Sequence, residues 1–214
     1  LAGEIDMTDR TEPLWNLTVA GLNVPMVRTK EMILRGDLDV KVATGQRSEG
    51  VLVSGTLNML RSTLLVDFNP LAPNLAGSTP TRPPFFRITE APFAEWRFDL
   101  KLLGDQFMRV RSPYFRTTLS ANMDLKGSFA NPELSGSVRN TRGELHFPGA
   151  KFSLDEGEAF IEAGRPDVVQ LDFSGIAQKA SRVIIMEVSQ TLDDPRVQFQ
   201  ATPPMSNAAI VRFL

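Results

Sequence analysis

The chain contains no cysteine and only one histidine, His146, among its 214 residues. Without cysteine there are no disulfides, no thiol catalysis and no thiolate metal sites. A lone histidine makes a zinc site implausible, because zinc sites draw several ligands from such side chains. An excess of one charge is also missing, since 23 basic residues stand against 25 acidic ones, for a formal net charge of −2. We therefore expect no nucleic-acid partner, because the chain has no global basic field.

Long apolar runs and the common catalytic motifs are also absent. No run approaches the roughly 18 apolar residues of a membrane-spanning helix, and the sequence has no P-loop, GxGxxG or GxSxG motif. Glu156 and Glu158 flank a glycine and could form a carboxylate pair for acid–base chemistry. Carboxylates in hairpin turns are common, however, so we predict that the protein is not an enzyme and uses no cofactor. Because the chain begins at Leu1 and ends inside an expected helix, we expect it to be a fragment of a longer protein.

A short basic and aromatic stretch has two interpretations. Arg109, Arg111 and Arg116 surround Tyr114 and Phe115. Such a mixture can bind single-stranded nucleic acid by charge and stacking. It is also typical of a charged strand edge that resists aggregation, which is the commoner arrangement.

Apolar and polar residues alternate along most of the chain, which is the pattern of strands with one dry and one wet face. Leu119, Met123 and Leu125, for example, are separated by polar side chains. In the second half of the chain, the residues that we expect on the apolar face are Leu119, Met123, Leu125, Leu145, Phe147, Phe152, Leu154, Ile161, Val169, Leu171, Phe173, Ile184, Met186, Val188, Val197 and Phe199.

The connections between these strands predict an antiparallel meander. Pro148–Gly149 and Asp155–Gly157 are tight turns, whereas parallel pairing would need long crossovers. Prolines are frequent in residues 70–92, which therefore cannot enter a strand ladder. We predict an upstream β segment over 1–69, a loop or linker over 70–92, and a C-terminal β domain over 93–214. Ser206–Leu214 is the one good helix candidate, with Ser206 as its N-cap.

The apolar face of such a sheet must be covered. The sheet could close into a barrel, pack on a second sheet, or curl into an open trough. The apolar residues include no polar group to orient a small ligand, so a trough would suit acyl chains or amphipathic strands. An ordinary hydrophobic core remains the alternative use of the same residues.

The order of several short elements resembles the C-terminal domain of TamB, the inner-membrane component of the translocation and assembly module, in the AsmA-like group. The matching elements are Phe107–Pro113, Leu125–Gly136, Gly143–Phe147, Phe152–Gly157 and Asp194–Asn207. Gln190 is a departure, because the family more often has glycine before the Asp–Pro turn.

The resemblance implies an all-β fold, in which a curled antiparallel sheet (a β-taco or open groove) has an apolar interior and one short C-terminal helix follows. It implies a periplasmic domain of a Gram-negative envelope protein, anchored in the inner membrane by an N-terminal helix that this chain lacks. The implied partner is an Omp85-family outer-membrane barrel, TamA-like. The implied roles are phospholipid transport and outer-membrane biogenesis, including protein assembly and secretion.

Our leading hypothesis is a hydrophobic conduit for phospholipid acyl chains. The alternatives are a chaperone-like module that holds unfolded outer-membrane proteins by β-augmentation, or a purely structural, closed β domain. The family has no catalytic residues to carry over.

Overall fold

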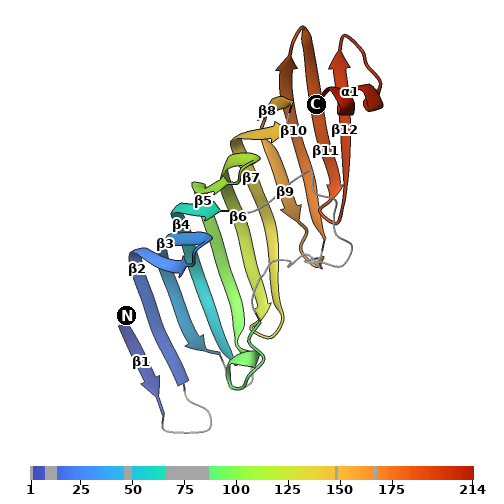
Figure 1. Cartoon of the computed structure of the whole chain (residues 1–214). Coiled ribbons are helices and arrows are strands. Elements are labelled where there is room, and N and C mark those ends of the chain that lie inside the picture. Colours follow the sequence, from blue (N-terminus) through green and yellow to red (C-terminus); the bar gives the residue numbers. More distant parts are fainter. Residues whose placement is uncertain (1, 8–13, 46–49, 66–86, 148, 166–167) are drawn as a thin grey trace.

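The computed structural model consists of one large curled sheet and a short C-terminal helix (Figure 1). It describes residues 2–7, 14–45, 50–65, 87–147, 149–165 and 168–214. Residues 70–86, most of the predicted proline-rich segment, lie outside this part. The all-β fold with a curled, open sheet and one short helix is confirmed.

The strands follow one another along the sheet almost in chain order. They are β1 (Ala2–Asp6), β2 (Leu14–Arg28), β3 (Met32–Thr44), β4 (Val51–Leu65), β5 (Arg97–Arg111), β6 (Phe115–Ser128), β7 (Pro132–Phe147), β8 (Ala150–Leu154), β9 (Gly157–Ile161), β10 (Val169–Lys179), β11 (Arg182–Thr191) and β12 (Asp194–Thr202). A 3₁₀ turn, η1 (Phe93–Glu95), precedes β5, and the helix α1 (Asn207–Phe213) ends the chain.

The twelve strands of the described residues belong to one sheet, in which β8 and β9 share the space between β7 and β10. The pairing is antiparallel except between β4 and β5, which are parallel. The expectation of a purely antiparallel sheet was therefore wrong at this pair. The physical reason is the long connection between Leu65 and Arg97, since a parallel neighbour needs a crossover of a dozen or more residues. The predicted division into 1–69, 70–92 and 93–214 stays a prediction, although the sheet itself runs through both halves.

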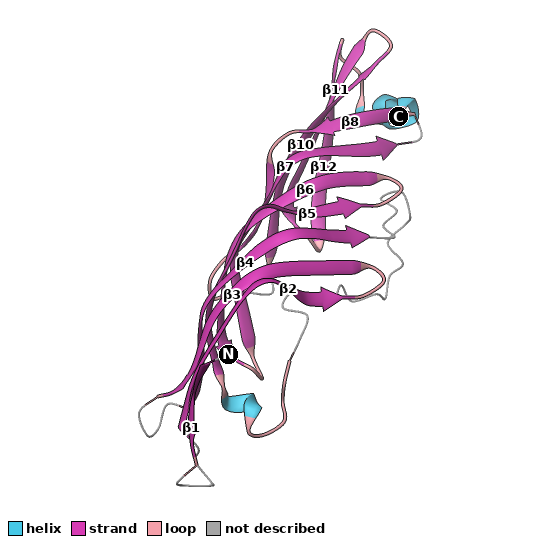
Figure 2. Ribbon diagram, turned by 90° about the vertical axis from the view of Figure 1, so that its left-hand side faces the viewer, coloured by secondary structure: helices cyan, strands magenta, loops and turns pink. Residues whose placement is uncertain are grey.

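The strands bend together toward one face, as the side view shows (Figure 2). Every neighbouring pair from β2 to β7 contains a register shift. Bulges of this kind bend and twist a strand, so a row of them across neighbouring strands curls the sheet. Gly55 and Gly136 lie within bent strands at φ 137° and 115°. A Cβ there would lie 2.1 Å from Asp39 O and 2.4 Å from Asn122 O, so only glycine fits.

Helix α1 folds back onto the end of the sheet. Ser206 is its N-cap, as predicted, with Oγ accepting a hydrogen bond from Ala209 N at 3.3 Å. Ile210 is fully buried, in a cluster with Phe152 and Ile184. The helix therefore covers part of the apolar face contributed by β8, β10 and β11.

Candidate functional site: an apolar groove

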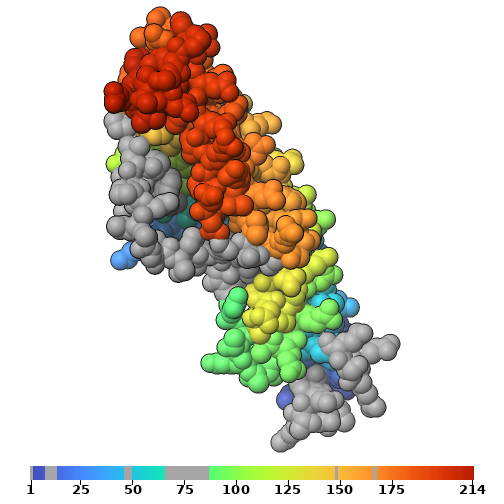
Figure 3. Space-filling view, turned by 90° about the vertical axis from the view of Figure 1, so that its right-hand side faces the viewer, coloured from blue at the N-terminus to red at the C-terminus, as the bar shows by residue number. Residues whose placement is uncertain are grey.

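The strand register places the whole predicted apolar set on one face of the sheet. Leu145 pairs with Phe152, Met186 pairs with Phe199, and residues paired directly across neighbouring strands point to the same side. Because the sheet curls toward this face, we call it the groove face and the opposite side the outer face. In Figure 3, β12 borders a hollow in which atoms of earlier strands are visible.

The predicted residues differ in how far they are exposed on the groove face. One part is buried: Met123, Leu125, Phe152, Leu154, Ile161, Val169, Ile184 and Met186. Another part is half-buried: Leu119, Leu145, Phe147, Leu171, Phe173, Val188 and Phe199. Val197, on the edge strand β12, is 48% exposed. The buried residues pack against one another and stabilise the sheet, while the half-buried residues are accessible to a ligand.

Fourteen of the sixteen predicted residues, all but Phe173 and Val197, separate into two packed clusters. The first cluster is built around β4, β5 and β6 and contains Met123, Leu125, Ile161 and Val169, with Leu119 and Leu171 packed against it. The second cluster contains Phe152, Leu154, Ile184 and Met186 near α1, with Leu145, Phe147, Val188 and Phe199 packed against it. The strands of the groove face are thus paired without interruption, but their buried side chains form two separate hydrophobic clusters.

The N-terminal strands contribute groove-face residues that the predicted set omits. Val40 pairs with Val19 on β2, and Val53 pairs with both Val42 and Phe98. Their signal was present in the sequence as the same alternation over residues 15–19 and 38–42. The groove face therefore extends from β2 to β12.

Aromatic side chains gather along one rim of the groove, where β6 ends and β7 begins. The ring centroids of Trp15 and Trp96 are 5.3 Å apart, and those of Phe98 and Phe129 are 4.0 Å apart in a stacked pair. Neighbouring strands are about 4.8 Å apart, so β2 and β5 would be separated by roughly 14 Å along a flat sheet. The contact between Trp15 and Trp96 therefore reaches over the groove face.

Comparison with known proteins identifies the family. The sequence matches the TamB C-terminal domain over residues 1–214. The chain belongs to this family. A search of curated proteins found no match. The resemblance that the sequence motifs indicated is confirmed over the whole length of this TamB-type domain.

Helix α1 lies at the C-terminal end of the TamB-type groove. Lys179 Nζ donates a hydrogen bond to Phe213 O and lies 4.6 Å from the centroid of the Phe213 ring. These contacts fix the end of the helix against β10. Within the described residues, no helix has the length and apolar character needed to cross a membrane.

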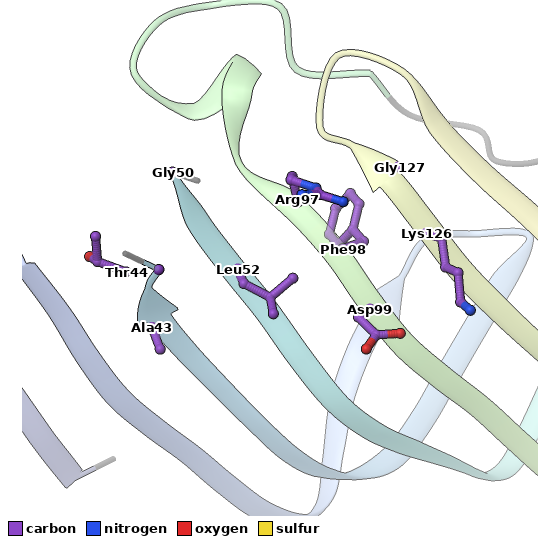
Figure 4. A pocket seen from close by; sticks show the side chains of 10 residues that line it. Ala43, Thr44, Gly50, Leu52, Arg97, Phe98, Asp99, Lys126 and Gly127 are labelled. Carbon is purple, nitrogen blue, oxygen red and sulfur yellow. The ribbon is translucent and has the colours of Figure 1, made fainter. Parts of the chain in front are cut away.

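A second depression lies at the ends of β3 to β6, away from the centre of the TamB-type groove (Figure 4). Its volume is about 400 Å³, and its charged residues are Arg97, Asp99 and Lys126. Asp99 and Lys126 are direct cross-strand neighbours. Opposite charges in this position stabilise a sheet, which accounts for these residues without a ligand.

Two carboxylates of the outer face, Glu158 and Glu144, have a lowered pKa. The hydrogen bond from Ser137 lowers the pKa of Glu158, and Arg139 Nε, at 2.9 Å from Oε1, lowers it further. A general acid needs a raised pKa, so the hypothesis of acid–base chemistry at Glu156 and Glu158 gains no support. The pKa of Glu144 is also lowered, mainly by a hydrogen bond from Lys151 and to a smaller extent by one from His146. His146 is therefore accounted for by a contact of 3.3 Å with a carboxylate on the outer face of this TamB-type domain.

Proposed function

We propose that this TamB-type domain is a periplasmic conduit in which phospholipid acyl chains slide along the groove face while head groups stay in water. The observation that carries the proposal is the groove face itself, an apolar surface that continues in register from β2 to β12 on an open, curled sheet. An acyl chain can contact the half-buried side chains of this face, and the apolar area buried by that contact supplies the free energy of binding. In this proposal the full protein is anchored in the inner membrane and meets an Omp85-family barrel, TamA-like, in the outer membrane.

Photo-crosslinking tests the conduit directly. A benzophenone side chain placed at Leu171, which is half-buried on the groove face, should form adducts with phospholipid in cells. The matched control is Asp172, the next residue of β10, which is exposed on the outer face. Equal lipid labelling at both positions would contradict the conduit.

Substitution of groove residues needs positions that the fold tolerates. Leu125 is only 6% exposed and sits in the first cluster, so an aspartate there would unfold the domain rather than block a ligand. Leu171→Arg and Phe173→Arg are better choices, because both side chains are half-buried. We expect folded variants that fail to support outer-membrane integrity. Folded variants with full activity would refute the conduit.

A second candidate function is a chaperone-like module that holds unfolded outer-membrane proteins by β-augmentation. The edge strand β12 favours it, because among the described strands β12 pairs only with β11. Peptide adducts instead of lipid adducts at Leu171, or at Gln200 on β12, would select this function. The third possibility, a closed structural β domain, requires a closed sheet, and the sheet is open.

A further inference from the structure

An arginine cluster lies on the outer face near the rim where β5 ends and β6 begins. It consists of Arg109, Arg111, Arg116 and Arg142. Arg111 pairs directly with Arg116, and Thr118 pairs with both Arg109 and Arg142, so three adjacent strands bring these side chains together. All of them are exposed, and they line an open depression of about 500 Å³.

Among the described residues, the one acidic cross-strand partner of the cluster is Glu144, which lies opposite Arg116, so a single carboxylate stands against four guanidinium groups. Glu144 is the one carboxylate among the residues that line the depression, and it already binds Lys151 Nζ at 2.6 Å and His146 Nε2 at 3.3 Å. Among the described residues, no arginine of the cluster forms an ion pair. Like charges directly opposite one another destabilise a sheet, so the pair of Arg111 and Arg116 is a cost that a bound anion would remove.

The position of the cluster indicates which anion it would bind. Val110 and Phe115 are the chain neighbours of Arg111 and Arg116, on either side of the turn at 112–114. Because side chains alternate along a strand, both point to the groove face, where Phe115 pairs with Leu145 and Val110 pairs with Thr117. A charged surface and an apolar surface therefore meet at this rim, within one residue of each other along each strand. A molecule with a negative head and an apolar tail matches both surfaces, and guanidinium groups bind phosphate oxygens in a bidentate manner.

The same geometry argues against a nucleic-acid site. Single-stranded nucleic acid is held by stacking on aromatic side chains beside the basic groups. Here Phe115 points away from the arginines and packs into both apolar clusters. The sequence pattern that suggested a basic and aromatic patch is divided between the two faces of the sheet.

We propose that the arginine cluster binds the phosphate of an anionic phospholipid at this rim and so holds the head group while the acyl chain contacts the groove face. This inference rests on the proposed conduit function for its ligand. It adds a polar site outside the apolar surface.

The test is binding of the purified domain to phosphatidylcholine vesicles with and without phosphatidylglycerol. We expect binding that needs the anionic lipid and weakens as salt is raised. In Arg111→Gln/Arg116→Gln, affinity should fall about fivefold for each arginine, thus on the order of twentyfold. The control Arg97→Gln/Lys101→Gln removes the same charge from the outer face of the same strand and should change affinity by less than about twofold.

Several results would overturn the proposal. Equal losses in both variants would indicate a non-specific charge effect. Full competition by inorganic phosphate, at concentrations matched to the lipid, would assign the cluster to a free anion. Tighter, arginine-dependent binding of a single-stranded oligonucleotide or an acidic peptide would assign it to another partner.

Failure of the conduit is distinguishable from failure of the cluster. Phe173→Arg, a half-buried position of the same strand, should abolish lipid crosslinking from the benzophenone at Leu171 but leave binding to anionic vesicles intact. If the groove proves to hold no lipid, vesicle binding by the arginine cluster can still be measured. If the cluster proves inert, crosslinking at Leu171 is unaffected.

Discussion

Gln190, in β11, has a φ of 77°, a left-handed conformation that L-residues with a side chain seldom adopt. The resemblance described in the sequence analysis implies glycine at this position. The left-handed conformation costs a residue with a Cβ about 1–2 kcal/mol. Glycine avoids this penalty but loses about 0.5–1 kcal/mol of chain entropy on folding.

Gln190→Gly should therefore stabilise the domain by roughly 0.5 kcal/mol, and Gln190→Val should destabilise it by about 1–2 kcal/mol. Urea unfolding curves measure both changes. The matched control is Gln178→Gly, at an exposed site in β10 with ordinary strand geometry, which should lower stability. If Gln190→Gly instead destabilises the domain, the contacts of the glutamine side chain stabilise the fold by more than its left-handed backbone conformation destabilises it.

Glu144 gives the outer face a pH dependence. Its pKa is lowered below the ordinary value of 4.5 by hydrogen bonds from Lys151 and then His146. A carboxyl group with a lowered pKa in the folded state stabilises the fold above its unfolded pKa, and this stabilisation is lost as pH falls through the lowered value. The difference in Tm between the wild type and Glu144→Gln should thus be constant above about pH 5 and shrink below pH 4.5.

The control for this prediction is the same pair of proteins in a Lys151→Met background. Removal of the main hydrogen-bond donor should reduce the effect of Glu144→Gln at every pH, as a double-mutant cycle would show. A Tm difference that persists unchanged at pH 3 would contradict the assignment.

At the scale of elements, α1 and the two apolar clusters act as separate units. Among the described residues, the cluster beneath α1 and the one around β5 and β6 have Phe115 alone in common. Ile210→Asp places a charge in a fully buried position, so α1 should detach from the sheet. The free energy of unfolding should fall by about 1.5–3 kcal/mol, because the burial of the isoleucine side chain is lost. Hydrogen exchange should then accelerate in β10 and β11 while β5 and β6 keep their protection.

Val211→Asp is the control for this element, because Val211 lies in the same helix and is 60% exposed. It should leave exchange in all four strands unchanged. Equal acceleration throughout the sheet in Ile210→Asp would show that the two clusters unfold as one.

Alternation in the sequence predicted which residues share a face, but it could not predict where a strand continues through an irregular point. Asn140 to Gly143 looks like a break, whereas β7 runs through it with a bulge that shifts the register between Thr118 and Leu119. The extra residue turns Arg142 to the outer face and Leu145 to the groove face. Three arginines of the cluster were visible in the sequence as a basic stretch, but Arg142 joins them only through this shift and through pairing between β6 and β7.

At the scale of the whole molecule, the single-layer sheet leaves much of the chain accessible. Its solvent-accessible surface is 14362 Å², for a mass of 23.7 kDa. A compact monomer of this mass exposes about 9,800 Å². A single-layer sheet exposes both faces, and on the groove face this leaves half-buried apolar side chains that a ligand would cover.

This excess surface predicts an unusually shallow response to denaturant. The slope m of the unfolding free energy against urea scales with the surface exposed on unfolding. Because the folded chain already exposes more surface than a compact protein, m should be roughly a fifth lower than for compact monomers of equal mass. Urea titrations followed by circular dichroism measure this slope.

A short-chain phosphatidylcholine that occupies the groove should raise the Tm of the domain as its concentration increases, because it binds only the folded state. A normal m that depends on protein concentration would instead mean that the groove face is covered by a second copy of the chain in solution.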